Sequence, residues 1–471
     1  SRIRERVQIL TQQVSRTFEE RHPSGGTIHI EDIQDQVELA LMRAGEHKVA
    51  RDYVLYREER ARVRSEQDTQ SSEGPQKEPA TVLVLGEDGE QRPLDIGRMQ
   101  TLVSEACEGL KDVDAGRIIN DSLSNMYDGI SAQDVATSLV MTARTLVEEE
   151  PHYTYVTARL LLDQLRTEAM AFLDWMLAVV DRAAAPERLM PLYTVTGHEV
   201  GAEAEIAELA GYAGSRPVRV GNAARGQVQL DVFGPIAELV WQLLLAEAPV
   251  SSEHWRLVEA MVGAVEARWH EPDHGIWEIR KPRRHHVHSK VMCWLAVDRG
   301  IRISERFLDR KKPAWEQLRQ TIAEDILDKA WHEESNAYTA AYGADDLDAA
   351  SLMIGLMGLV DCTDPRFMAT IDAIDKRLRM GPTVFRYLAD DGLPGREGGF
   401  FICASWLVDS FVKAGRRDEA ESLFESMIEL AGPEGLLPEQ YDPLLRRTLG
   451  NHPQAYSHIG LIENALTLSS S

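Results

Sequence analysis

Apolar side chains recur every three or four residues along most of this 471-residue chain, which is the spacing of one face of an α-helix. In the first 64 residues the pattern is clearest at Ile33, Val37, Ala40, Leu41 and Ala44. It stops between residues 65 and 80, where the chain is polar and contains Ser, Pro and Gly. We interpret this stretch as a flexible linker.

Residues 81–95 have the pattern of a β-hairpin. Two runs of strand-forming residues flank Glu87-Asp88-Gly89-Glu90, and Asp-Gly is a strong turn signal. Helical spacing then returns and predicts three helices, at about residues 96–109, 113–126 and 131–147. A single apolar helix is predicted next, running from Val156 to Val180.

From residue 233 onward the pattern predicts one helix after another, joined by loops rich in Trp, Gly and Pro. The predicted helices cover about residues 233–248, 252–270, 285–301, 313–328, 345–359, 364–377, 399–414, 416–430 and 454–468. Long helices joined by loops of unequal length favour a toroid of helix pairs, with a site built from loops at one end.

The composition narrows the classes of function. A formal net charge of −25 argues against a nucleic-acid groove, which needs a basic stripe. No apolar run is long enough to cross a bilayer, and no secretory signal opens the chain. The four cysteines are far apart and lack metal-ligand spacing. We therefore expect a cytoplasmic protein with reduced thiols and with neither membrane nor nucleic-acid partners.

One candidate for chemistry is the stretch Asp273-His274-Gly275-Ile276-Trp277-Glu278-Ile279-Arg280. Trp277 offers a flat apolar face to a sugar ring, and its bulk shields the neighbouring carboxyl of Glu278 from water. A desolvated carboxyl keeps its proton to higher pH, as a general acid must. The alternative is a solvated loop Glu278 that pairs with Arg280.

A second candidate is Leu437-Pro438-Glu439-Gln440-Tyr441-Asp442-Pro443. Two carboxylates from separate loops that flank one bond form the general arrangement of glycosidases. Glu439 is therefore a candidate partner of Glu278. The alternative is a turn rich in Pro and Asp, which is common.

Several ordered motifs carry a family resemblance. They include EAMAFLDWML, GYAGSRPVRVGNAA, QLDVFGPI, HGIWEIR, DDLDAASLMI, FRYLADDGLPGREGGFFICASWLVD and LLPEQYDP. The region from about Glu168 to Leu468 resembles glycoside hydrolase family 15, the glucoamylase and trehalase type. The resemblance implies an (α/α)6 toroid and an inverting, exo-acting hydrolase that needs no cofactor.

The resemblance also implies roles for individual residues. Glu278 would be the general acid and Glu439 the general base, with room between them for a water. Arg386 resembles the family's arginine that binds sugar hydroxyls, and Trp277 would form a wall of the pocket. Arg280 would steer Glu278 or the sugar. The substrate would be an α-linked glucoside such as trehalose, maltose or a dextrin.

Two basic stretches of the sequence each allow two interpretations. Arg219, in SRPVRVGNAA, lines the mouth of the funnel or pairs with surface acids. The tract Arg283-Arg284-His285-His286-Val287-His288 looks like a metal site, but the family has a helix start here. We therefore assign no metal.

Residues 1–167 resemble the ATP-cone region of ribonucleotide reductase large subunits. KVARDYVLYREERARVR looks like the end of a first cone, residues 81–149 look like a second, and EEEPHYTYVTARLLLDQL resembles the segment that follows the cones. The resemblance implies ATP or dATP binding and oligomers formed through the cones. However, Leu85-Gly86-Glu87-Asp88-Gly89 carries an acid where the family has cations for the triphosphate. We therefore expect weak nucleotide binding or none.

These observations predict a mainly α-helical chain in four parts. Residues 1–64 form a partial first cone, 65–80 a linker, 81–155 a second cone-like domain and 156–471 a toroid. About ten helices follow Val156 rather than twelve, so the (α/α)6 toroid is expected to be incomplete and to lack the family's opening pair. Three functions stay open: an α-glucoside hydrolase, a nucleotide-sensing module, and an inert fusion of two incomplete domains.

Overall fold

The computed structural model describes residue 37 and residues 82–86, 90–183, 186–392, 397–432 and 435–470. The predicted partial cone, the linker and the hairpin turn at residues 87–89 therefore lie outside the described residues, apart from Val37. The chain divides into two compact units. Residues 1–94 with 127–131 form one, and residues 95–126 with 132–471 form the other.

The described part of the first unit is a small sheet in the order β2-β1-β3. Strands β1 (Leu83–Leu85) and β2 (Gln91–Pro93) pair antiparallel, which confirms the predicted hairpin. Strand β3 (Ile130–Ser131) runs parallel to β1 and was not predicted. The carboxylate of Asp128 accepts the backbone N–H of Leu83 at 2.9 Å and ties the third strand to the hairpin.

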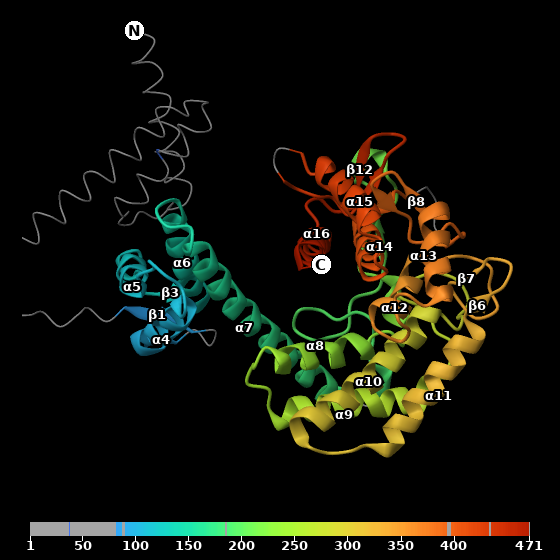
Figure 1. Cartoon of the computed structure of the whole chain (residues 1–471), viewed down its shortest axis with the longest axis horizontal. Helices are drawn as coiled ribbons and strands as arrows, with labels where there is room; N and C mark the ends of the chain where they lie inside the picture. Colours follow the sequence, from blue (N-terminus) through green and yellow to red (C-terminus); the bar gives the residue numbers. More distant parts are fainter. Residues whose placement is uncertain are drawn as a thin grey trace, which may run out of the picture. The chain divides into compact units, whose positions relative to one another are not determined.

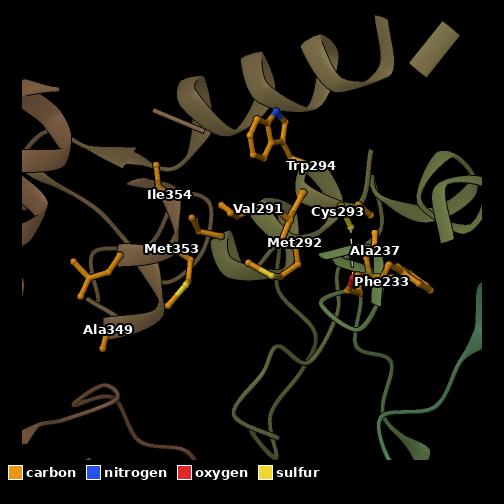
Figure 2. Packing of buried hydrophobic residues seen from close by; sticks show 14 of the residues in the cluster. Phe233, Ala237, Val291, Met292, Cys293, Trp294, Ala349, Met353 and Ile354 are labelled. Carbon is orange, nitrogen blue, oxygen red and sulfur yellow. Dashed lines mark hydrogen bonds between the residues drawn. The ribbon is translucent and has the colours of Figure 1, made fainter. Parts of the chain in front are cut away.

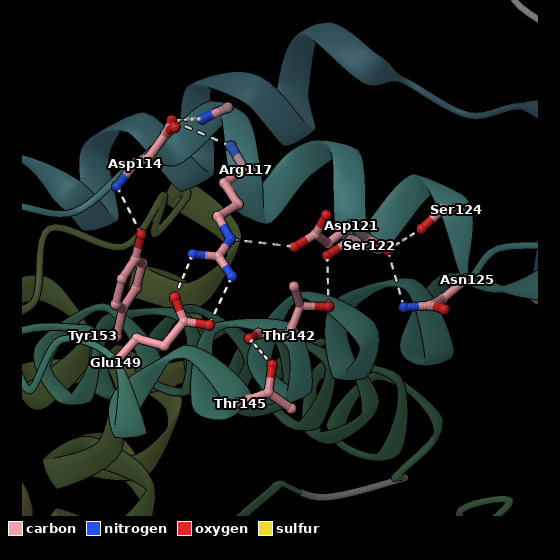
Figure 3. A network of polar contacts seen from close by, with 11 residues as sticks. Asp114, Arg117, Asp121, Ser122, Ser124, Asn125, Thr142, Thr145, Glu149 and Tyr153 are labelled. Atoms are coloured by element: carbon pink, nitrogen blue, oxygen red, sulfur yellow. Dashed lines mark hydrogen bonds and ion pairs between the residues drawn. The ribbon is translucent and has the colours of Figure 1, made fainter. Parts of the chain in front are cut away.

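The second unit opens with three helices that match the predictions to within a few residues. They are α4 (Ile96–Cys107), α5 (Ala115–Ser124) and α6 (Ala132–Thr145), and the short η1 (Leu146–Glu148) extends the last of them. Figure 3 shows the polar contacts around α5. Arg117 binds Glu149 through two hydrogen bonds of 2.7 and 2.8 Å, and the hydroxyl of Tyr153 accepts the N–H of Asp114. These contacts fix α5 against η1 and the start of the next helix.

Helix α7 runs without a break from Tyr153 to Arg182, 30 residues, which confirms the single helix predicted across this region. Its first part packs on α4 and α6 and buries Tyr153, Val156 and Leu160. Its last part packs on α8 and α9, and there Leu173 and other apolar residues join the main hydrophobic core. One continuous helix therefore packs against α4 and α6 at its start and against the main hydrophobic core at its end.

In the remaining part of the chain, α8, α9, α11 and α12 pack against α10, whose residues are nearly all buried between Val287 and Ser304, and α15 and α16 pack against α14 (Figure 1). The helices are α8 (Phe233–Leu245), α9 (Ser252–Arg268), α10 (Val287–Leu308), α11 (Pro313–Lys329), α12 (Met353–Leu356), α13 (Pro365–Arg377), α14 (Phe401–Lys413), α15 (Arg417–Leu430) and α16 (Ala455–Ser470). The short helices are η2 (Pro186–Arg188), η3 (Tyr212–Gly214), η4 (Ala223–Gly226) and η5 (Ala349–Leu352). All the predicted helices of this half are present except one.

The core between α8, α10 and α12 is closely packed, as Figure 2 shows for Phe233, Met292 and Met353. Gly234 permits the approach of α8 to α10. A Cβ at this position would lie 2.6 Å from the carbonyl oxygen of Met292, which is closer than any real contact. Since interiors are packed at crystal-like density, this region is a rigid base for the loops above it.

The predicted helix at residues 345–359 is wrong. The structure has only η5 and the four-residue α12 there. The reason is local: Asp348 accepts the N–H of Ala350, so helical structure starts after it, and Gly358 at φ 84° ends the segment.

Short strands were also missed. A five-stranded sheet has the order β12-β11-β10-β9-β8, and two further pairs are β4-β5 and β6-β7. Their bounds are β4 (Ala204–Ile206), β5 (Val218–Val220), β6 (Trp331–His332), β7 (Ala337–Tyr338), β8 (Arg379–Met380), β9 (Thr383–Val384), β10 (Gly399–Phe400), β11 (Gln440–Asp442) and β12 (Arg447–Leu449). Strands of two or three residues are too short to show an alternating pattern. No helix in the described ranges combines the length and the apolar character needed to cross a membrane.

Candidate active site

Glu278 lies on the loop between α9 and α10. The loop is closed by a backbone pair between Asp273 and Arg284, with hydrogen bonds of 2.8 and 2.9 Å. Glu278 has φ 55°, a left-handed conformation that is uncommon for a residue other than glycine. The side-chain amide of Gln227 donates to the carbonyl oxygens of Glu278 and Ile279, each at 3.2 Å. These bonds hold the unusual backbone in place.

The half-buried carboxyl of Glu278 is bound by Asn222. The Nδ2 atom of Asn222 donates to Oε2 of Glu278 at 3.1 Å. The other end of the same amide, Oδ1, accepts the N–H of Ala224 at 2.8 Å and caps η4. The segment after β5 thus holds both the side chain and the backbone of the candidate acid.

Arg280 and Arg219 both bind Glu203, on the loop that leads into β4. The Arg280 fork meets the two Glu203 oxygens at 3.0 and 2.5 Å, and Nε of Arg219 lies 3.2 Å from Oε1 of Glu203. The hydrogen bond with Arg280 lowers the pKa of Glu203. The Arg280–Glu278 pair considered from the sequence is not formed, because the fork of Arg280 binds Glu203 instead.

Trp277, next to Glu278, is fixed by Asp348. The indole N–H lies 2.9 Å from each carboxylate oxygen of Asp348. Burial raises the pKa of Asp348 to about 6. The indole ring also meets Phe400 and Trp406, with ring centres 6.4 and 6.0 Å away. Asp348 also caps η5 by accepting the N–H of Ala350 at 2.8 Å.

Arg386 follows β9 and contacts the aromatic side chains around Trp277. Its guanidinium lies 5.1 Å from the ring centre of Trp277 and 4.6 Å from that of Phe400. It also pairs with Glu397, with Nε 3.1 Å from Oε2. These contacts bring the predicted Arg386 to the Glu278 loop.

Glu439 lies between α15 and α16, directly before β11, and three donors hold its carboxylate. Oε2 accepts the N–H of Asn451 at 3.0 Å and the side-chain amide of Asn451 at 3.1 Å, and Oε1 accepts the hydroxyl of Tyr456 at 2.5 Å. Burial and the bond to Glu439 raise the pKa of Tyr456. Gly450, at φ 69°, leaves room for the carboxylate, because a Cβ there would lie 2.5 Å from Oε2.

The sheet between the loops connects the two carboxylates. Gln440, next to Glu439, pairs with Phe400 across β10 and β11, and the ring of Phe400 lies against Trp277, next to Glu278. The structure therefore joins two carboxyl groups, an arginine and an indole through one scaffold of short strands. Such a set can transfer protons to and from a substrate that also offers a ring face and hydroxyl groups.

Asn222, Glu203, Asn451 and Tyr456 belong to this arrangement and were not predicted as site residues. The sequence offered one signal, since Asn222 and Arg219 share a family motif.

The His-containing tract runs into α10, and its histidines His286 and His288 are buried. Burial lowers the pKa of His288 to about 4, and His286 packs against Gly275. In the described part of the chain, no three His, Cys, Asp or Glu side chains are grouped closely enough to hold a metal ion. The four cysteines are free thiols.

Two families match this chain. Residues 153–466 match the model of glycosyl hydrolases family 15, and residues 2–62 and 82–168 match the ATP cone domain. The trehalase of Thermoplasma volcanium is 34% identical over 300 residues, 63% of this chain and 48% of its own length. The ribonucleoside-diphosphate reductase subunit alpha of Chlamydia muridarum is 36% identical over 195 residues, 41% of this chain and 18% of its own.

A solved wild-type glycosidase is similar over 80% of this chain and 98% of its own, with 19% identity and a TM-score of 0.48. The chain spans about half the length of the curated trehalases that it matches. Both family resemblances inferred from the motifs are confirmed by the family models.

Proposed function

Because the chain belongs to glycosyl hydrolases family 15, we propose that it is an inverting, exo-acting hydrolase of α-glucosides that uses Glu278 as general acid and Glu439 as general base. The fold is mainly helical, and a part of the toroid type follows an ATP-cone region in the sequence. This agrees with the sequence prediction. Trehalose is the first substrate to consider, since the similar curated proteins are named trehalases. Maltose and dextrins end in the same α-linked glucose.

The observation that carries this proposal is the contact of Trp277 with Phe400, which links the two carboxylate loops. In the proposed reaction Glu278 gives its proton to the glycosidic oxygen as the bond to the anomeric carbon breaks. Glu439 takes a proton from the water that attacks from the opposite face. Inversion requires about 6.5–9.5 Å between the two carboxyl groups.

The surrounding residues would bind and orient the sugar. The indole N–H of Trp277 is bound by Asp348, which fixes the direction of the ring face. Arg386, whose guanidinium lies over the Trp277 ring, offers N–H groups to hydroxyls of the bound sugar. Arg280 and Arg219, both bound to Glu203, would act at the mouth of the site. Fixed side chains of this kind reduce the entropy lost on reaching the transition state.

Glucose release from trehalose and from maltose tests the proposal, with Glu278→Gln and Glu439→Gln as the variants. Each should lower kcat about 100- to 10,000-fold, because each removes one proton-transfer group. Glu429→Gln, on the exposed side of α15, is the matched control and should keep full activity. Proton NMR of the first product distinguishes inversion, which yields β-glucose, from retention. Activity retained in both site variants would refute the assignment.

A second proposal concerns the ATP-cone region, because residues 2–62 and 82–168 match that domain. We propose that it binds ATP or dATP weakly or not at all. Glu87 supplies negative charge where a triphosphate needs cations. Oligomers formed through the cones would then not depend on nucleotide.

A further inference from the structure

The side-chain amide of Asn222 can be oriented in only one way. Its Oδ1 accepts the backbone N–H of Ala224 at 2.8 Å, and that N–H can only donate. The Nδ2 end must therefore face Glu278, where it donates to Oε2 at 3.1 Å. The hydrogen-bond network itself thus settles which end is nitrogen.

This geometry decides where the proton of Glu278 resides. An amide NH2 donates and does not accept, and the carbonyl oxygen of a neutral carboxyl is a better acceptor than its hydroxyl oxygen, so this contact favours Oε2 as the accepting oxygen and Oε1 as the oxygen that carries the proton. We propose that Asn222 is a positioning residue that makes Oε1 the proton-donating oxygen of Glu278. The inference rests on the proposed role of Glu278 as general acid.

The same contact acts after the proton has moved. The proton leaves Oε1 for the glycosidic oxygen, the electron pair of the O–H bond stays on the carboxylate, and the sugar–oxygen bond breaks. Oε2 then carries more negative charge while still accepting from Nδ2 of Asn222. A hydrogen bond to a charged acceptor is stronger than one to a neutral acceptor, so Asn222 favours the state after transfer.

The backbone of Glu278 is fixed from the same short segment. Gln227 donates to the carbonyl oxygens of Glu278 and Ile279, and its own Oε1 accepts from Gln229 at 3.3 Å, which sets its orientation. Asn222 and Gln227 flank η4, so one turn of chain positions both the carboxyl and its main chain.

The charges near Glu278 come from Arg280 and Glu203. The hydrogen bond to Glu203, and then the charges of Glu203 and Glu278, raise the pKa of Arg280, whose hydrogen bonds go to Glu203. Glu203 also accepts the N–H of Ala223 at 3.4 Å, next to Asn222. Asn222 is therefore a neutral donor to the Glu278 carboxyl, and the residue next to it donates to this ion pair.

Two variants separate capping from positioning. Asn222→Asp keeps an oxygen to cap η4 but replaces the donor with a second carboxylate, whereas Asn222→Ala removes both functions. Asp364→Ala is the matched control, because Asp364 caps α13 by accepting the N–H groups of Arg366 and Phe367. The measurements are the pH profile of kcat/KM for trehalose and the crystal structure of each variant.

We expect Asn222→Ala to lower kcat about 10- to 100-fold with little change in KM, and its crystal structure to show the Glu278 carboxyl turned away. In Asn222→Asp the basic limb of the profile should move to higher pH, because a second carboxylate opposes loss of the proton. Asp364→Ala should change neither.

An unmoved Glu278 carboxyl in the Asn222→Ala crystal would overturn the inference, even if the chain hydrolyses no glucoside. An unmoved pH profile in an active Asn222→Asp variant would also overturn it. Failure of the proposed function has a different signature, namely activity that survives Glu278→Gln.

Discussion

Gly450→Ala is a sharp test of the geometry around Glu439. Gly450 has φ 69°, and a Cβ there would lie 2.5 Å from Oε2 of Glu439 and 2.8 Å from its Cβ. An ordinary contact begins at 3.4 Å, so one group must move by about 0.9 Å. Turning the Glu439 side chain relieves the contact with Oε2, whereas the contact with its Cβ also requires a small shift of the backbone next to the paired strands β11 and β12.

The expected effect of Gly450→Ala has two parts, one on stability and one on the catalytic rate. An L-residue at this φ costs about 1 kcal/mol, which lowers Tm by about 2 °C in a unit of this size. Displacing a catalytic group by about 1 Å costs about 100-fold in rate. The variant should therefore stay folded and lose about two orders of magnitude in kcat, while KM for trehalose changes little.

Gly415→Ala is the matched control. Gly415 has φ 76°, and a Cβ there would meet nothing within 4 Å. It should show only the fall in Tm that the backbone conformation causes, smaller than that of Gly450→Ala, with full activity. The assay is glucose release at saturating trehalose, together with thermal unfolding followed by circular dichroism. If both variants keep wild-type kcat, the reasoning about Glu439 is wrong.

Two further predictions concern stability and the cone. Burial, and then the charge of Asp273, raise the pKa of Asp231 to about 7, so its neutral form favours folding. This contribution is complete below pH 4 and is lost as pH rises through 7, by about 4 kcal/mol at most. Urea unfolding at pH 5 and pH 8 should show the loss, and Asp231→Asn should remove most of it; an unchanged difference would contradict the prediction. Calorimetric titration with ATP and dATP should give Kd weaker than about 1 mM, and micromolar binding would contradict the argument from Glu87.

The helices could be predicted from the sequence because each buries one face. The boundaries of α8 and α11 agree with the prediction to within three residues, since apolar periodicity and the Pro at the start of α11 are local signals. The helix predicted at residues 345–359 was wrong because helical structure starts only after Asp348. The side chain of Asp348 is held by Trp277, which is 71 residues away in the sequence.

For the site, the sequence allowed individual residues to be predicted but not the contacts between them. Glu278 and Glu439 were proposed from their neighbours in sequence and from a family resemblance, and their catalytic roles stay predictions. The contacts that hold them, such as Asn222 with Glu278 at a separation of 56 residues, leave no local pattern. Such pairings depend on the turns of short strands, which the sequence signals least clearly.

Helix α7 has a consequence for the origin of the chain. The two family models overlap at residues 153–168, inside a helix of about 45 Å. A crossover at this point would join two coding sequences inside one continuous helix, and each inserted or deleted residue would turn one buried face by about 100° against the other. Crossovers that conserve the residue count between Leu160 and Leu173 are therefore the ones that leave both hydrophobic faces buried.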